Sequence, residues 1–343
     1  MEIDDSAVLQ TKEADVCSTA RILLSAALAS LFAVTGASAA EQAFPGRPLT
    51  MIVPFAAGGP TDTIARVTAE GMSKSLGQPI IIENVAGAGG TLGAARAARA
   101  APDGYTLLIH HLGLATAASL YRALPYDTKA AFAPIGLVTE APMTIIGRSD
   151  LEPNSLPELV AYLRQRGDRV TLANAGLGSA SQLCGMMLMA ALDQKLTAVP
   201  YKGGAPLMND LLGRQVDLAC DQATSSINQI KAKQVKAYAV TTGTRLTSLP
   251  DLPTAQESGL PGFAVSVWHG IYAPKGTSPQ VIEKVAAALR RALADPELAR
   301  RFAELATEPA AAEHATPEAL GQKLVAEVDR WGPVIKASGH YAD

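Results

Sequence analysis

Short runs of glycine, alanine, serine and threonine stand at five places in the chain, each directly after an apolar, β-branched stretch. They are residues 55–62, 110–116, 174–181, 202–205 and 221–225. Small residues let a ligand approach the backbone closely, and the N–H groups at a helix start carry partial positive charge, which favours an anion. Lys202 is the only lysine or arginine in these runs, so neutral donors would hold most of a bound carboxylate. One such loop is an ordinary tight turn, but five favour a shared ligand cleft.

Known catalytic motifs are absent from the sequence. It contains neither G-x-x-x-x-G-K-[ST] nor G-x-S-x-G, and in residues 87–93 the third glycine comes one position late for a dinucleotide fingerprint. His110 and His111 are adjacent, so on a strand they would point to opposite faces, which is poor metal geometry. We therefore predict no catalytic residue, no metal and no cofactor.

From Leu49 onward, β-branched runs alternate with helical patterns, which is typical of an α/β protein with mostly parallel sheets flanked by helices. One helix is predicted over residues 62–76 and stops at Gly77. A second is predicted over residues 279–294, with Ser278 before Pro279 as its start signal. A capping box that begins at Ser155 indicates a further helix start. The predicted strands are residues 49–54, 80–83, 106–110, 169–173, 197–201, 216–219, 235–241 and 265–272.

The chain has no long linker, although 343 residues exceed what a single core usually holds. Two domains without a linker imply that the chain crosses between them more than once. We place these crossings near residues 141–143 and 262–265. The prediction is a first domain of residues 41–142 and 265–343, with residues 143–264 inserted as a second domain.

Residues 22–34 form an uncharged apolar run that is too short to span a bilayer, and small residues follow it. We interpret residues 1–40 as a cleaved secretory signal, which predicts a periplasmic protein; an uncleaved N-terminal anchor is the alternative. Cys17 would leave with the signal. The remaining pair, Cys184 and Cys220, are candidates for a disulfide, or else are two buried free thiols.

The formal charge of −3 comes from 29 basic and 32 acidic residues. Residues 1–40 hold two of the basic and five of the acidic residues, so the rest of the chain is formally neutral. The basic residues form no stripe, so we predict no nucleic-acid partner.

Several motifs spread over the chain carry a family likeness. Residues 52–66 (IVPFAAGGPTDTIAR), 102–106 (PDGYT), 199–204 (VPYKGG) and 273–277 (APKGT) closely resemble the Bug family of solute receptors, the substrate-binding proteins of tripartite tricarboxylate transporters. The likeness covers essentially all of the chain after residue 40. It implies a two-domain periplasmic-binding-protein clamshell (type II) with two crossovers, which closes around a small carboxylate ligand and delivers it to membrane transporter subunits. We expect a monomer.

The resemblance also implies ligand-binding residues. In the first-domain loop these are Phe55, Ala56, Gly59, Thr61 and Asp62, and in the second domain they are Ser179, Ser181, Tyr201, Gly203 and Asp221. Asp62 would also stabilise the start of its own helix. Gln182 and the pair His110-His111 depart from the family pattern on cleft loops, so the ligand cannot be transferred from a relative, and His111 is a further candidate contact.

Two alternatives stay open. One is an enzyme of the same fold that uses Asp221, Tyr201 or His111 as acid or base. The other is a receptor domain that reports the same class of acid to a sensor kinase.

Overall fold

The structure is a computed structural model and describes residues 44–338. The predicted signal at residues 1–40 lies outside the described residues. Among the described helices, none is both long and apolar enough to cross a membrane.

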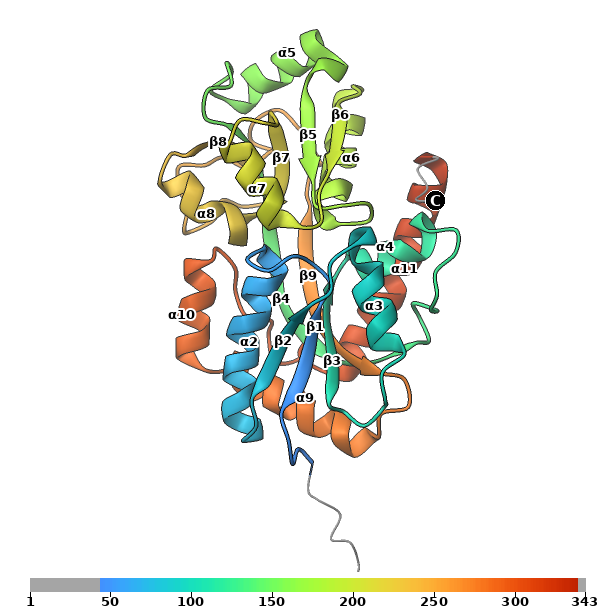
Figure 1. Ribbon diagram of the computed structural model, residues 1–343. Coiled ribbons are helices and arrows are strands. Elements are labelled where there is room, and N and C mark those ends of the chain that lie inside the picture. Colours follow the sequence, from blue (N-terminus) through green and yellow to red (C-terminus); the bar gives the residue numbers. More distant parts are fainter. Residues whose placement is uncertain (1–43, 339–343) are drawn as a thin grey trace, which may run out of the picture. The chain divides into compact units, whose positions relative to one another are not determined.

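The strands pair in the order β2-β1-β3-β9-β4-β7-β5-β6, and β8 pairs with the other edge of the β4 segment that pairs with β7 (Figure 1). Pairing is parallel within β2-β1-β3 and within β7-β5-β6, and antiparallel wherever β4 or β9 takes part. Two parallel blocks, β2-β1-β3 and β7-β5-β6, are therefore joined and extended by the antiparallel strands β4, β8 and β9. The strands are β1 (Leu49–Val53), β2 (Ile80–Asn84), β3 (Thr106–His111), β4 (Phe132–Arg148), β5 (Thr171–Asn174), β6 (Thr197–Pro200), β7 (Leu218–Gln222), β8 (Val235–Val240) and β9 (Ser266–Pro274).

Strand β4 runs through both halves of the fold. Residues Phe132 to Pro142 pair with β9, and from Met143 onward the strand pairs with β7 and β8. We call the part built on β2-β1-β3-β9 the first lobe and the part built on β7-β5-β6 the second lobe. We propose that the two domains divide at this change of partner, as 41–142 with 265–343 and as 143–264.

The helices cover these sheets. They are α2 (Pro60–Leu76), α3 (Thr91–Ala98), α4 (Gly113–Leu120), α5 (Leu156–Arg166), α6 (Ala180–Leu192), α7 (Gly204–Leu212), α8 (Ala223–Lys231), α9 (Pro279–Leu293), α10 (Pro296–Glu304) and α11 (Pro317–Ser338), with the 3-10 turns η1 (Ala88–Gly90) and η2 (Gly167–Arg169). As predicted, α2 ends at Gly77, which adopts a left-handed conformation, and Ser278 caps α9.

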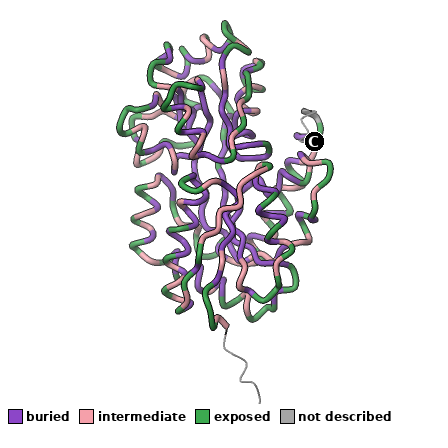
Figure 2. The backbone as a smooth tube through the Cα atoms, in the orientation of Figure 1, coloured by how far each residue is buried: buried purple, intermediate pink, exposed green. Residues whose placement is uncertain are grey.

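Each lobe has its own apolar core. In the first lobe, Leu108, Leu137 and Leu320 belong to one buried cluster. In the second lobe the sheet is covered on both faces, by α5 and α6 on one side and by α7 on the other. Figure 2 shows the buried strands in the middle of each lobe, with exposed turns on the outer helices. The cores hold the ends of the strands, and therefore the loops that follow them, in fixed positions.

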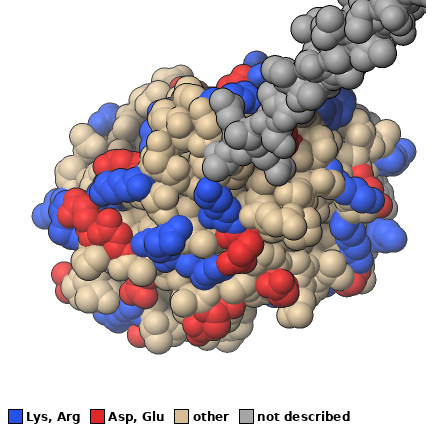
Figure 3. Space-filling view, turned by 90° about the horizontal axis from the view of Figure 1, so that it is seen from below, with Lys and Arg blue, Asp and Glu red and all other residues tan. Residues whose placement is uncertain are grey.

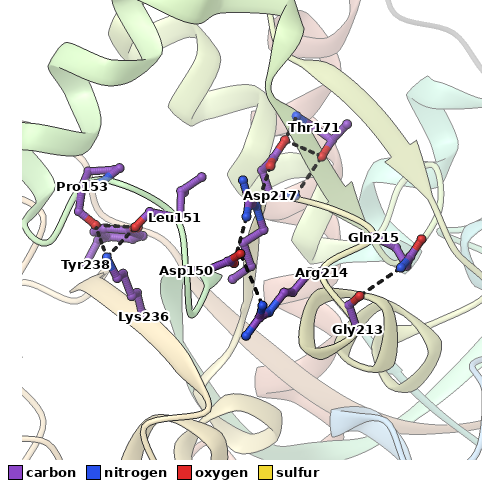
Figure 4. Close-up of polar contacts among 11 residues, drawn as sticks. Asp150, Leu151, Pro153, Thr171, Gly213, Arg214, Gln215, Asp217, Lys236 and Tyr238 are labelled. Atoms are coloured by element: carbon purple, nitrogen blue, oxygen red, sulfur yellow. Dashed lines mark hydrogen bonds and ion pairs between the residues drawn. The ribbon is translucent and has the colours of Figure 1, made fainter.

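Polar side chains fasten the edge of the second lobe that lies away from the first (Figure 4). The Asp217 carboxylate accepts hydrogen bonds from the Thr171 N–H and hydroxyl, both at 2.8 Å, and pairs with Arg148 at 2.9 Å. Lys236 donates to the Leu151 carbonyl and, at 3.1 Å, to that of Pro153. The Asp217 contacts tie the ends of β4 and β5 to the start of β7, and the Lys236 contacts tie β8 to the segment after β4.

The surface carries both signs of charge. On the face seen in Figure 3, lysine and arginine are interspersed with aspartate and glutamate, and no wide area of one sign stands out. Arg301, for example, pairs with Glu70 at 2.6 Å, and Lys129 with Asp329 at 2.6 Å.

Candidate functional site

A small cavity lies where the loops of the two lobes meet, and we call it the interlobe cavity. Its volume of about 10 Å³ is close to the least that holds one water molecule. Its lining residues are Phe55, Pro60, Thr61, His111, Ala175, Ser179, Ala180, Ser181, Gly204, Asp221 and Gln222. The cavity is thus nearly shut, and a ligand larger than water can enter only if the lobes separate.

Four helices begin at this cavity. Pro60 opens α2, Ala180 opens α6, Gly204 opens α7, and Gln222 is the N-cap of α8. The first N–H groups of a helix have no intrahelical partner, and each helix start carries about half a positive charge. Among the described residues that line the cavity there is no lysine or arginine. The site is therefore suited to an anion held by backbone dipoles and neutral side chains.

Aromatic rings form the wall on the first-lobe side. The Phe55 ring stacks on His111, with centroids 4.7 Å apart and planes 18° apart, and meets His110 edge-on at 5.7 Å. His269, from β9, lies 5.7 Å from His111, and its Nε2 is 3.3 Å from the Thr61 hydroxyl. The three histidine rings therefore gather in one cluster, although adjacent strand residues were expected to point apart. No group of metal-ligating side chains suited to a metal occurs within residues 44–338.

The hydrogen bonds of these histidines fix their protonation. His111 Nδ1 accepts from the Gly113 N–H at 2.8 Å, and His110 Nδ1 accepts from the His111 N–H at 2.8 Å. His110 Nδ1 also lies 3.2 Å from the His111 carbonyl oxygen, but the shorter contact at each Nδ1 is an accepted N–H bond, which favours a neutral ring with its proton on Nε2. Burial lowers the pKa of His110 and of His269 to about 3 and lowers that of His111 well below its usual value. The cluster is neutral at pH 7, and His111 can offer the cavity an uncharged donor.

Asp62 is buried but does not line the cavity. Its carboxylate accepts from the Gly58 N–H at 2.9 Å, from Asn84 at 2.9 Å, and from Arg66 through two nitrogens at 2.8 and 3.0 Å. Burial by itself raises the pKa of this carboxyl, but the hydrogen bonds from Arg66 and the other donors hold that pKa below its usual value. Both carboxylate oxygens thus already accept hydrogen bonds from within the first lobe, and Asp62 shapes the loop at residues 55–59.

Hydroxyl and carboxyl groups form the second-lobe wall. Ser179 caps α6 by accepting from the Gln182 N–H at 3.2 Å. The buried Ser181 hydroxyl has no hydrogen-bond partner within the described chain. Asp221 accepts from the Ser225 hydroxyl at 2.5 Å, and its burial raises its pKa to about 6 despite that bond. This wall thus offers a free donor beside a carboxyl group that is easily protonated.

Tyr201 does not line the cavity. Its hydroxyl donates to Asp210 of α7 at 2.7 Å, and burial together with this bond raises the pKa of Tyr201 to about 12. Gln182 is likewise occupied, because its side-chain oxygen accepts from the Gly178 N–H at 2.5 Å. Of the residues expected to contact a ligand, Tyr201 thus acts within its own lobe.

Ala56, Gly59 and Gly203 lie where the loops of the two lobes touch. The Ala56 N–H donates to the Lys202 carbonyl at 3.2 Å. A Cβ on Gly203 would come within 2.9 Å of the Ala56 nitrogen, and one on Gly59 within 3.6 Å of the Ala205 nitrogen. These residues determine how closely the lobes approach, and they lie outside the cavity lining.

Further contacts join the lobes on the other side of the cavity. The Thr116 hydroxyl donates to the Gly178 carbonyl at 3.3 Å, and the Tyr121 hydroxyl to the Leu177 carbonyl at 3.1 Å. Gly89 is so close to this loop that a Cβ would lie 1.5 Å from the Leu177 oxygen. The structure is therefore a closed form.

A disulfide supports the second-lobe wall. It joins Cys184 of α6 to Cys220 of β7, with Cα atoms 5.9 Å apart. Because Cys184 follows Ser181 by one turn and Cys220 precedes Asp221, the bond holds both side chains close to their positions.

Five further lining residues are not among the expected contacts: Pro60, Ala175, Ala180, Gly204 and Gln222. All five belong to the small-residue loops that the sequence predicts, so their proximity to the cavity follows from the pattern but their individual roles do not. His269 had no such signal, because β9 joins β3 only through pairing across a long sequence separation.

The model of a family described as "Tripartite tricarboxylate transporter family receptor" matches residues 64–340. A UPF0065 protein of Agrobacterium vitis is 52% identical over 300 residues, which cover 88% of this chain and 87% of that protein.

Solved structures are similar over most of the chain. The periplasmic binding protein BugD is 50% identical, with a TM-score of 0.85 over 88% of this chain and 100% of that one. MatC from Rhodopseudomonas palustris, solved with bound malate, is 41% identical, with a TM-score of 0.82 over 85% of this chain and 100% of that one. A second protein of R. palustris, solved with adipate, is 31% identical, with a TM-score of 0.82 over 86% of this chain and 98% of that one.

Proposed function

The chain belongs to the tripartite tricarboxylate transporter receptor family of periplasmic solute-binding proteins, and on that basis we propose that it captures a small carboxylated organic acid in the interlobe cavity. The lobes close around the acid, and the loaded receptor then delivers it to a membrane transporter of the tripartite tricarboxylate type. The protein acts as a monomer in the periplasm, after removal of residues 1–40.

The observation that carries this proposal is the convergence of four helix starts on one closed cavity whose described lining holds no lysine or arginine. Micromolar affinity requires about −8 kcal/mol. Hydrogen bonds to a charged group contribute about 1.5–3 kcal/mol each, and each helix start adds about 0.3–1 kcal/mol. Donors such as Ser181 and His111, together with the free N–H groups, supply a gross contribution of about that size, from which the cost of association and of ordering the ligand is subtracted.

The relatives support the same chemistry. MatC was solved with malate and another R. palustris protein with adipate, and both ligands are carboxylic acids. The family and the solved neighbours are receptors, and we propose binding without chemical turnover. Tyr201, one candidate acid or base, donates a hydrogen bond to Asp210 and does not line the cavity.

The binding test is a thermal-shift screen of the dialysed protein against mono-, di- and tricarboxylates and aromatic acids, followed by calorimetric titration. We expect at least one acid to raise Tm and to bind one molecule per chain. Ser181→Ala should weaken that binding about tenfold or more, because its hydroxyl is a free donor in the cavity.

Ser266→Ala is the matched control, since Ser266 is an exposed serine at the start of β9. Its affinity should equal that of the unmodified protein. Absence of stabilisation by every acid, or full affinity in Ser181→Ala, would contradict the proposal.

A further inference from the structure

We propose that the interlobe cavity takes a dicarboxylate and that Asp221 takes up a proton as this ligand binds. The inference rests on the proposed function and specifies it further: the ligand class is a dianion, and its capture depends on pH. The charges around the cavity lead to this conclusion.

The positive charge available at the cavity is limited. Four helix starts, from α2, α6, α7 and α8, supply about half a positive charge each, or about two in total. Among the lining residues within 44–338 there is no lysine or arginine. The positive potential therefore balances one dianion and leaves nothing for a third negative charge.

Asp221 supplies that third charge if it stays ionised. Its side chain is 1% exposed, and the Ser225 hydroxyl donates to its Oδ2 at 2.5 Å. A Cβ on Gly204, the first residue of α7, would lie 3.5 Å from the same oxygen, so the carboxyl faces the cavity beside a helix start. Carboxylates that share one buried site do not all ionise together, and the group with the weaker stabilisation keeps a proton.

No charged group on the neighbouring described elements is available to neutralise an ionised Asp221. Helix α6 carries no charged side chain. On α2, Asp62 is paired with Arg66; on α7, Asp210 accepts from Tyr201; on β4, Glu140 is paired with Lys323. All of these pairs lie outside the cavity lining.

The histidines are poorer acceptors of the proton than Asp221. A second proton on His111 would have to go to Nδ1, which already accepts the Gly113 N–H, and His110 Nδ1 likewise accepts the His111 N–H. His269 does not line the cavity, lies behind Thr61 and His111, and is fully buried. Burial has already raised the pKa of Asp221 to about 6, whereas it lowers the pKa of all three histidines.

The proton has a chemical use in the complex. A protonated Asp221 becomes a hydrogen-bond donor to one ligand carboxylate, beside the Ser181 hydroxyl. The same carboxyl would repel that carboxylate if it were ionised. The proton comes from the solvent when the lobes are open, and it is released again when the ligand leaves.

Calorimetric titration at pH 7 in PIPES, HEPES and imidazole buffers measures the proton count, because the heats of ionisation of these buffers differ. The probes are malate, succinate and adipate, each with a matched monocarboxylate: 3-hydroxybutyrate, butyrate and hexanoate. We expect more than about half a proton to be taken up per dicarboxylate. Between pH 7 and 8.5, where these acids are fully ionised, Kd should rise by up to about tenfold per pH unit.

Two variants assign the proton to Asp221. Asp221→Asn should bind dicarboxylates with no proton uptake and with a Kd independent of pH. Ser225→Ala removes the hydrogen bond that favours the ionised carboxyl, so it should lower the proton count at pH 7 and tighten dicarboxylate binding.

The possible outcomes separate the two proposals. Dicarboxylate binding without proton uptake, or uptake that persists in Asp221→Asn, overturns this inference and leaves the receptor function intact. Binding of monocarboxylates alone overturns it as well. If no acid binds at all, the proposed function itself is wrong.

Discussion

Replacing Gly89 by alanine should block closure of the lobes without disturbing either lobe. The new Cβ would lie 1.5 Å from the Leu177 carbonyl oxygen. The loop that contains Leu177 must therefore retreat by about 2 Å to reach ordinary contact distance. Such a retreat breaks the Tyr121–Leu177 and Thr116–Gly178 hydrogen bonds, which now measure 3.1 and 3.3 Å. At about 1 kcal/mol each, the closed state loses about 2 kcal/mol, and affinity falls about thirtyfold.

Gly77→Ala is the matched control. Gly77 has a φ of +69°, close to the +60° of Gly89, but no atom lies within 4 Å of the Cβ it would carry. Both variants should lose about 1–2 kcal/mol of folding stability through backbone strain, and only Gly89→Ala should lose affinity for the acid. Calorimetric titration and urea unfolding measure the two quantities. Full affinity in Gly89→Ala, or an equal loss in Gly77→Ala, would refute the closure mechanism.

Three further predictions concern stability and the role of Tyr201. Reduction of the Cys184–Cys220 disulfide, which closes a loop with a sequence separation of 36, should lower the free energy of unfolding by about 3–4 kcal/mol; an unchanged urea midpoint in reductant would contradict this. Acidification from pH 7 to pH 5 should also lower that free energy, because the buried His110 and His269 have pKa values of about 3 and bind protons only after unfolding. Below about pH 6.5, each histidine lowers the free energy of unfolding by about 1.4 kcal/mol per pH unit. Asp221, with its raised pKa of about 6, binds a proton in the folded state and offsets the loss from one histidine between about pH 6 and pH 4. Equal urea midpoints at pH 7 and pH 5 would contradict this prediction. Tyr201→Phe should cost about 1 kcal/mol of stability and leave ligand affinity unchanged, since its hydroxyl donates to Asp210; a large loss of affinity in titration would place that hydroxyl at the ligand.

Features encoded by neighbouring residues could be predicted from the sequence. The end of α2 at Gly77 needs only a residue that tolerates a left-handed backbone, and the start of α9 needs only Ser278 before a proline. The small-residue loops were likewise visible, and six of the eleven predicted ligand contacts line the interlobe cavity: Phe55, Thr61, His111, Ser179, Ser181 and Asp221.

Long-range pairing could not be predicted. The sequence pattern indicates strand β4 only as a crossing near residues 141–143, because the strand is buried almost throughout and so lacks the alternation of a half-exposed strand. It also contains Pro134 and Pro142, which normally argue against a central strand. The antiparallel direction of β9 is set by its partners β3 and β4, and no local pattern records it.

The directions of the side chains at the site could not be predicted from the sequence either. Tyr201 ends a predicted strand, and only the structure shows Asp210 beside its hydroxyl. Strand β7 was expected at 216–219 but spans Leu218–Gln222, so Asp221 belongs to the strand end and not to the loop after it. The histidine cluster depends on the pairing of β3 with β9, which brings His269 to His111.

The most direct test of the central claim is a crystal structure of the protein with the acid that binds most tightly. We predict closed lobes with a ligand carboxylate among the starts of α2, α6, α7 and α8, within hydrogen-bond distance of the Ser181 hydroxyl and His111 Nε2. Ligand density at any other place, or open lobes around a bound acid, would contradict the account.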